Sequence, residues 1–436
     1  MLLAVIYCAI SIIASATNSS TSNSSNNKKK LAGIPLEKYT IVWSAEAEDE
    51  EGKEIADYLM EKTGCTMPTF AAPANSDITT IKGRHIHIIN TSETKLWEYK
   101  ITFSKNSLII DGGGNWAMLK AADIVAEAIC KTSIRQGYRV TGSVEGEQLF
   151  QMGKESDLRI LVDNIWDYSK DTIPPAWKSM ATDCRDFVRA PQFAQMVRAY
   201  MPDVLNLQEY SAHMDAEFLP LIEKYGYVHT TTGTACDWNN TPILYNKNTV
   251  KMIDSEFVLF TPKKWSNHGS KSYSWAVFER LSDKKQFAII NTHLWWKSEK
   301  AQPGSNQARA AQIRLIIAEA QCIKAKYPKI PVFVTGDMNS EEGTMAIQQF
   351  FEAGFTPCYK VATEYANLGN GHHICSPGEG YSRKSKRKSG ERSKGAIDHA
   401  FIWNQGQCEI KVFDCITTWF TVPLTDHYPY IIDSRL

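Results

Sequence analysis

The sequence predicts an α/β protein in which a small α+β domain precedes a larger domain of two packed sheets flanked by helices. The chain has 436 residues, more than one hydrophobic core ordinarily serves, so two domains are expected. Strand-like and helical patterns are followed near residue 136 by a segment without periodicity. Beyond that segment, strand-like runs outnumber helical ones and several follow one another directly. This order favours packed sheets over a doubly wound parallel sheet.

The N-terminus predicts export. Residues 1–16 form an apolar run that ends in Ala14-Ser15-Ala16. A small-x-small end, and a length too short to span a bilayer, are typical of a secretory signal peptide, so a secreted, extracellular protein is expected. The polar tract that follows predicts a flexible tether over residues 17–36.

Composition excludes some classes of function. Lys+Arg and Asp+Glu both number 48, so any affinity for a polyanion must come from local patches. Of the ten cysteines, Cys8 lies in the predicted signal peptide and the other nine show no metal-ligand spacing. This pattern argues against a zinc site, and the odd number leaves at least one thiol free.

The small α+β domain is expected over residues 37–135, followed by a linker over 136–156. Its apolar periodicities predict strands at 39–43, 85–89, 99–102 and 108–110, and helices at 51–63 and 115–131.

The larger domain is expected over residues 157–436. Strands are predicted at 158–165, 204–208, 242–246, 275–281, 287–293, 331–335, 397–403 and 409–413, and helices at 190–200, 306–327 and 344–351.

Polar side chains lie at the ends of these predicted strands. They are carboxylates, carboxamides and histidines, namely Asn164, Glu209, His293, Asp337, Asn339, Asp398, Asp426 and His427. Such side chains are the ingredients of a hydrolytic site built around a hard cation. Oxygen ligands favour Mg²⁺, with Mn²⁺ or Ca²⁺ as alternatives, over zinc.

Six segments around these residues carry a resemblance to a known family. In chain order they are ILVDNIW, LNLQEYS, INTHLWW, VTGDMNS, IDHAFIW and TDHYPY. Together they resemble the motifs of the endonuclease/exonuclease/phosphatase, or DNase I-like, superfamily. The resemblance covers residues 157–436 and implies a four-layer α/β sandwich and a hydrolase that acts on phosphate esters.

The resemblance implies the metal ligands. Glu209 would be the principal ligand of the cation, with Asn164 beside it. Asp426 would support the metal or the geometry of the neighbouring histidine.

The resemblance also implies the catalytic residues. His427, paired with Asp398, would be the base or a stabiliser of the transition state. Asp337 would orient or deprotonate the attacking water, and Asn339 would hold the water or a phosphate oxygen. His293 would contact the scissile phosphate. The sequence leaves open whether His427 or Asp337 activates the water.

The substrate is expected to be a phosphate ester in nucleic acid. The segment GAIDHAFIW lacks the Trp-Cys-Asp-Arg run of the inositol 5-phosphatase branch, and TDHYPY resembles the closing motif of secreted deoxyribonucleases and sphingomyelinases. A sphingomyelinase-like phosphodiesterase acting on phospholipid is therefore the alternative. The basic segment 382–394 has seven basic residues and one acid. It would bind either a nucleic-acid backbone or an anionic lipid surface, or it would be a solvated loop.

The small domain carries a looser resemblance. The segments GKEIADYLMEKTGCTMP, HIHIIN and YKITFSKNSLIIDGGGNWAMLKAADIVAEAI resemble the N-terminal accessory domain of hexosaminidase-type glycoside hydrolases. This resemblance implies contact with carbohydrate, and a carbohydrate-associated binding module is the non-enzymatic alternative. The protein is expected to be a monomer.

Overall fold

The structure, a computed structural model, describes residues 29–45, 51–73, 76–89, 94, 97–113, 115–145, 148, 150–169, 184–230, 233–234, 237–266, 270–365, 396–403, 406–416 and 425–436. The predicted signal peptide, the first part of the predicted tether and the basic segment 382–394 lie outside these residues. Within them, no helix has both the length and the apolar character needed to cross a lipid bilayer.

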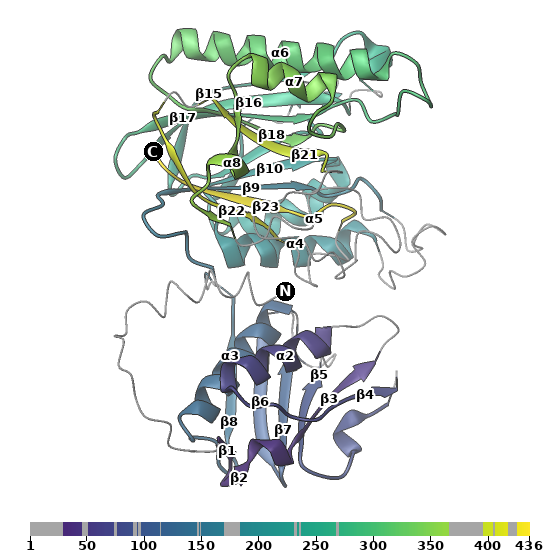
Figure 1. The fold of residues 1–436 in the computed structure, drawn as a ribbon, viewed down its shortest axis with the longest axis vertical. Helices are drawn as coiled ribbons and strands as arrows, with labels where there is room; N and C mark the ends of the chain where they lie inside the picture. The colour runs from purple at the N-terminus through teal and green to yellow at the C-terminus, as the bar shows by residue number, and fades with distance from the viewer. Residues whose placement is uncertain are drawn as a thin grey trace.

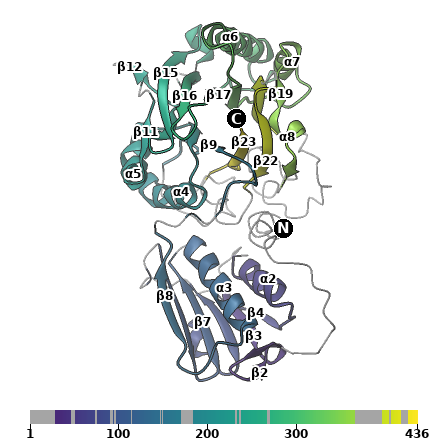
Figure 2. The ribbon, with the colours of Figure 1, turned by 90° about the vertical axis from the view of Figure 1, so that its left-hand side faces the viewer.

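The first part of the chain folds as a six-stranded sheet with two helices on one face (Figures 1 and 2). Its elements are β3 (Thr40–Ala45), α2 (Glu51–Thr63), β4 (Thr69–Pro73), β5 (His85–Ile89), β6 (Glu98–Ser104), β7 (Ser107–Gly112), α3 (Asn115–Cys130) and β8 (Arg139–Ser143). The strand order is β4-β3-β5-β7-β6-β8, with the first four strands parallel. Ile55 and Val125 of the two helices lie in one core cluster with Ile41 and Ile86 of the sheet. The predicted small α+β fold is confirmed.

Two stretches that were predicted to be irregular take part in this fold. β8 lies within the predicted linker 136–156 and pairs with β6. Within the predicted tether 17–36, β1 (Lys30–Leu31) pairs with β2 (Ile34–Pro35), and a 3-10 helix (Leu36–Lys38) follows. Leu31 and Leu36 are fully buried. Short edge strands are held by backbone hydrogen bonds, so they need no long apolar alternation that a sequence pattern would reveal.

The remainder of the chain forms two larger sheets. The first has the order β11-β14-β10-β9-β23-β22-β20, and the second has the order β15-β16-β17-β18-β21-β19. The first contains β9 (Leu158–Asn164), β10 (Val204–Gln208), β11 (Tyr227–His229), β14 (Ile243–Asn246), β20 (Glu364–Tyr365), β22 (Glu409–Cys415) and β23 (Tyr430–Arg435). The second contains β15 (Val250–Leu259), β16 (Ser272–Arg280), β17 (Gln286–His293), β18 (Val332–Asp337), β19 (Thr356–Pro357) and β21 (Asp398–Trp403).

These sheets pack face to face between helices (Figure 1). The helices are α4 (Asp186–Tyr200), α5 (Ala212–Glu223), α6 (Ser305–Lys326), α7 (Met345–Glu352) and the single turn α8 (Cys358–Val361). Val162 and Ile432 of the first sheet share a core cluster with Phe287 and Phe333 of the second. A second cluster packs α4 and α5 on the first sheet, and a third packs α6 and α7 on the second. The predicted four-layer α/β sandwich is confirmed.

The chain between the two parts is anchored to the sandwich. Phe150 stacks on Tyr200 of α4 with ring centroids 4.6 Å apart, and its backbone N–H donates to the carbonyl of Ala199 at 2.9 Å. The backbone N–H of Gly153 donates to Asp433 Oδ2 at 2.7 Å. Phe150 also belongs to the same apolar cluster as the core of the N-terminal sheet. The end of the predicted linker is therefore a fixed part of the larger fold.

Candidate active site

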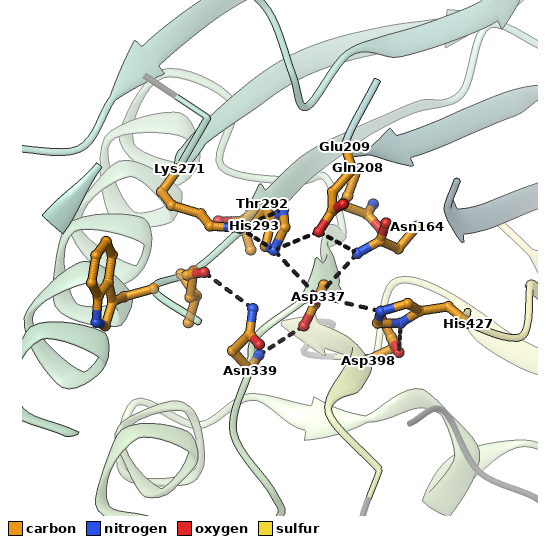
Figure 3. A network of polar contacts seen from close by, with 12 residues as sticks. Asn164, Gln208, Glu209, Lys271, Thr292, His293, Asp337, Asn339, Asp398 and His427 are labelled. Atoms are coloured by element: carbon orange, nitrogen blue, oxygen red, sulfur yellow. Dashed lines mark hydrogen bonds and ion pairs between the residues drawn. The ribbon is translucent and has the colours of Figure 1, made fainter. Parts of the chain in front are cut away.

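Strand pairing places the predicted polar residues side by side. Asn164, the last residue of β9, pairs with the last residue of the parallel strand β10, and Glu209 follows that residue. In the second sheet, β17, β18 and β21 set His293 opposite Asp337 and Asp337 opposite Asp398. Figure 3 shows these side chains pointing toward one another. Residues far apart in the sequence thus meet because their strands end together.

Asp337 lies at the centre of the network. Its Oδ2 accepts a hydrogen bond from Asn164 Nδ2 at 3.1 Å and lies 3.2 Å from His293 Nε2. Its Oδ1 accepts a hydrogen bond from the backbone N–H of Asn339 at 2.9 Å. Burial would raise the pKa of this carboxyl, but His293 and then His427 hold the pKa below its ordinary value. Asp337 is therefore an ionised carboxylate with both oxygens oriented by neighbours.

Glu209 joins the network from the first sheet. Its Oε2 accepts a hydrogen bond from the backbone N–H of Asp167 at 3.0 Å, and its Oε1 lies 3.8 Å from His293 Nε2. Burial would raise the pKa of Glu209, but His293 and Lys271 lower it below its ordinary value. Its backbone φ of 55° is a left-handed conformation that a residue with a side chain seldom adopts. Such strain is typical of functional positions, where the surrounding structure imposes it.

His427 and Asp398 form a buried pair on the other side of the network. Their Nδ1 and Oδ2 atoms lie 2.7 Å apart. Because Asp398 occupies Nδ1, the second ring nitrogen, Nε2, is the one turned toward Asp337 and Asp426, at 3.8 Å from an oxygen of each. Burial would lower the pKa of His427, but Asp398 and then Asp426 raise it well above its ordinary value.

The side chains border a cleft of ≈ 300 Å³. Its lining is Asp167, Glu209, Asn240, Ser270, Lys271, His293, Trp296, Asp337, Asn339, Asp426 and His427. The predicted residues Asn164 and Asp398 are not part of this lining. They lie behind it, where Asn164 donates to Asp337 and Asp398 holds His427. The structure therefore brings all the predicted site residues together.

Lys271 is a site residue that the sequence did not indicate. It is 4% exposed, and its Nζ lies 2.5 Å from His293 Nε2 and 3.1 Å from His293 Nδ1. Burial lowers the pKa of Lys271, although Glu209 and Asp337 act in the opposite direction. The segment SKSYSW matches none of the motifs. The only indication in the sequence was indirect, because several carboxylates buried in one site need a positively charged group nearby.

Arg189 of α4 is a second residue that the sequence did not indicate. Its guanidinium donates to the carbonyls of Ile165, Trp166 and Tyr168 at 2.7, 3.0 and 3.0 Å. These carbonyls flank Asp167, whose amide binds the carboxylate at position 209. Arg189 thereby fixes the loop that follows β9 and positions one wall of the cleft.

Two buried amide side chains join the sheets beneath the cleft. Gln208 Nε2 donates to Asn291 Oδ1 at 2.7 Å, and Asn206 Nδ2 donates to Thr335 Oγ1 at 2.8 Å. Each bond crosses from the first sheet to the second. The two halves of the site are thus held in register by hydrogen bonds between buried side chains, as a preorganised site requires.

The donor set fits a hard divalent cation. Ligand atoms of Glu209, His293 and Asp337 all lie within 4.8 Å of one another. Asp426 also borders the cleft, burial raises its pKa to about 7, and its buried Oδ1 has no hydrogen-bond partner among the described residues. An unsatisfied carboxylate oxygen among other carboxylates is an environment that a bound cation would satisfy. Asn164 directs its amide nitrogen at these carboxylates, so its oxygen does not face them.

The four-layer fold with a polar cleft at its strand ends is that of a phosphoesterase. The chain belongs to the Endonuclease/Exonuclease/phosphatase family, whose model matches residues 185–408. It is therefore a hydrolase that acts on phosphate ester bonds. The sequence prediction of this family is confirmed. No curated protein matches the chain.

Solved structures with a similar fold are distant in sequence. An endonuclease/exonuclease/phosphatase family protein from Bacteroides thetaiotaomicron is 18% identical, with a TM-score of 0.49 over 64% of this chain and 97% of that one. A mannosyl-6-phosphatase from the same organism is 17% identical, with a TM-score of 0.48 over 64% and 99%. The human Nocturnin catalytic domain is 20% identical, with a TM-score of 0.46 over 64% and 93%. The family assignment rests on residues 185–408 and not on these likenesses.

Proposed function

We propose that the chain is a divalent-metal-dependent phosphodiesterase that hydrolyses nucleic acid. The observation that supports the proposal most directly is the convergence of Glu209, Asp337 and the His427–Asp398 pair on one cleft. Glu209 and Asp426 would hold the cation, and Asn164 would position Asp337 from behind through the hydrogen bond from its amide nitrogen. When bound, a cation of this kind neutralises the charge of the phosphate and lowers the barrier to attack by water.

Proton transfer falls to His427. With Nδ1 held by Asp398, Nε2 is the nitrogen that exchanges a proton at the cleft. Asp337 instead uses both oxygens as acceptors for neighbouring groups, so its part is to orient the water. The proposal thus assigns proton transfer to His427 and orientation of the water to Asp337, the two roles that the sequence left open.

Three side chains suit the phosphate oxygens. His293 and Lys271 lie in contact at the floor of the cleft and would supply donors and positive charge. Asn339 is held by a hydrogen bond from its Nδ2 to the carbonyl of Leu294 at 3.2 Å and has a left-handed φ of 46°. Its fixed place beside Asp337 suits it to hold the water or a phosphate oxygen.

The test is a panel of substrates assayed with Mg²⁺ and with EDTA. Plasmid DNA, RNA, sphingomyelin and bis(p-nitrophenyl) phosphate are compared. We expect hydrolysis of nucleic acid with Mg²⁺ and its loss in EDTA, because the charge of the phosphate would then be uncompensated. Glu209→Gln should weaken the metal dependence and the rate together. Full activity in EDTA would contradict the metal assignment.

The same panel separates the alternatives. Hydrolysis of sphingomyelin in preference to DNA and RNA would make the chain a lipid phosphodiesterase. Activity on none of the substrates, with a folded protein and Mg²⁺ present, would favour a carbohydrate-associated binding module.

Export and association are part of the proposal. Residues 1–16 support secretion through their apolar run and small-x-small end. Fractionation of expressing cells should find the protein outside the cytoplasm, with an N-terminus beyond residue 16. Size-exclusion chromatography with light scattering should give the mass of one chain.

A further inference from the structure

Two consecutive tryptophans beside the cleft have opposite surroundings. Trp295 is 3% exposed, its Nε1 donates to Ser305 Oγ at 3.1 Å, and its ring packs edge-on against Trp265 at 5.3 Å. Trp296 is 51% exposed and lines the cleft together with His293. The first ring is therefore part of the core, whereas the second presents its indole to the same space as the predicted catalytic residues.

The backbone around Trp296 is fixed on both sides. Arg309 Nη1 donates to the carbonyl of Trp295 at 3.1 Å and to that of Lys297 at 2.8 Å. One residue earlier, the backbone N–H of Leu294 donates to the carbonyl of Asp337 at 2.9 Å. The backbone that carries this exposed indole is tied to β18, the strand that ends in Asp337. The site is therefore preorganised, and a ligand that stacks on the indole spends little binding free energy on ordering the protein.

A lysine side chain lies over this ring. The Nζ of Lys297 lies 5.4 Å from the centroid of the Trp296 ring, and the buried Lys271 lines the same cleft. A stacking ring beside cations is the combination that binds single-stranded nucleic acid, in which bases stack while phosphates meet positive charge.

We propose that Trp296 is a stacking platform for the nucleobase next to the scissile phosphate. This inference rests on the proposed function. It names the part of the substrate, in addition to the phosphate, that the cleft would recognise. Insertion into lipid is less well supported, because it needs several apolar side chains together. Trp296 is the only exposed large apolar residue among the described ones that line the cleft. A nucleobase, by contrast, requires a single flat face.

The test compares two single-stranded DNA oligonucleotides of equal length, one with bases and one abasic. For the wild type with Mg²⁺, the KM for the abasic strand should exceed that for the strand with bases. In Trp296→Ala the ratio of these two KM values should fall by about tenfold, as expected from the loss of one base–aromatic stack. Trp296→Phe should retain part of the ratio.

A matched control is Phe187→Ala. Phe187 is 52% exposed but does not line the cleft, so its removal should leave the ratio unchanged. Binding of the fluorescently labelled strand with bases, measured by anisotropy in EDTA, gives a readout independent of hydrolysis. Trp296→Ala should bind this strand about tenfold more weakly than the wild type.

The outcomes separate the two proposals. If the wild type hydrolyses both strands and Trp296→Ala leaves the ratio unchanged, stacking is wrong while the phosphodiesterase stands. Loss of binding to phosphatidylcholine vesicles with an unchanged ratio would make the ring a lipid contact and also overturn stacking. If the wild type hydrolyses neither strand, the proposed function fails. The anisotropy measurement then still decides whether Trp296 binds bases.

Discussion

The N-terminal sheet and the catalytic sandwich both bury histidines, but in different surroundings. On β5, His87 is fully buried and neither ring nitrogen has a hydrogen-bond partner among the described residues. Its neighbour His85 lies 5.3 Å away, centroid to centroid. In the sandwich, His427 is held by Asp398, and His293 contacts Lys271 and the central carboxylate.

This difference separates packing from chemistry. A buried polar group without a partner costs free energy, and the N-terminal sheet accepts that cost with a neutral imidazole used as a core side chain. In the sandwich, partners from separate strands fix the orientation of each imidazole and hold charge in place. Burial of a histidine therefore does not identify a site, whereas convergence of oriented partners does.

The sharpest test of the comparison is to remove a histidine from each region. His427→Ala should reduce kcat by about 10²-fold or more, because it removes the proton-transfer group, and Asp337→Asn should have an effect of similar size. His87→Leu should leave kcat unchanged. Steady-state kinetics on bis(p-nitrophenyl) phosphate measures all three, and circular dichroism checks that each variant is folded. Near wild-type turnover in His427→Ala or Asp337→Asn would show that the role assigned to that residue is wrong.

Much of the sandwich was accessible from the sequence because its central strands are buried on both faces. β9 and β10 are buried along their whole length and are rich in aliphatic residues, so their positions and the polar residues at their ends were predicted. The edge strand β15 was not predicted. Most of its side chains are partly exposed, and its residues show no apolar alternation. Helix α5 was also missed, although the side chain of Ser211 caps it by accepting a hydrogen bond from Met214 N–H at 3.1 Å.

The site was predictable where motifs supply residues and was not where the fold alone supplies them. The predicted residues lie at strand ends within short recognisable segments. Lys271 and Arg189 lie outside such segments and reach the site through packing. Their positions depend on which helix and which strand pack next to the cleft, and a single sequence does not reveal this packing.

A second test divides the molecule between the two regions. A chain beginning at Gln148 keeps Phe150 and Gly153, which are anchored to the sandwich, and all the site residues. It should retain kcat on bis(p-nitrophenyl) phosphate. Its melting temperature should fall, because the N-terminal sheet shares an apolar cluster with α4 and the ion pair between Glu145 and Lys224 is lost. A folded but inactive fragment would show that the N-terminal region completes the site.

A chain beginning at Gly153 serves as the comparison and should be less stable, since it lacks the stack of Phe150 on Tyr200.

The smallest expected effect concerns the pH dependence of stability. Burial, and then the neighbouring His85, lower the pKa of His87 from 6.5 to about 4, although Asp77 acts in the opposite direction. Between these two values the unfolded chain binds a proton at His87 and the folded chain does not. The stability that the neutral imidazole contributes is therefore complete above pH 6.5, and it is lost progressively as the pH falls toward 4.

Replacement by leucine removes this titration and breaks no hydrogen bond, since neither ring nitrogen has a described partner. Urea unfolding at a series of pH values should thus show a shallower loss of stability below pH 6.5 in His87→Leu than in the wild type. Other groups titrate in both proteins, so the difference between the two curves isolates His87. Parallel curves would contradict this account, because they would mean that folding leaves the pKa of His87 unchanged.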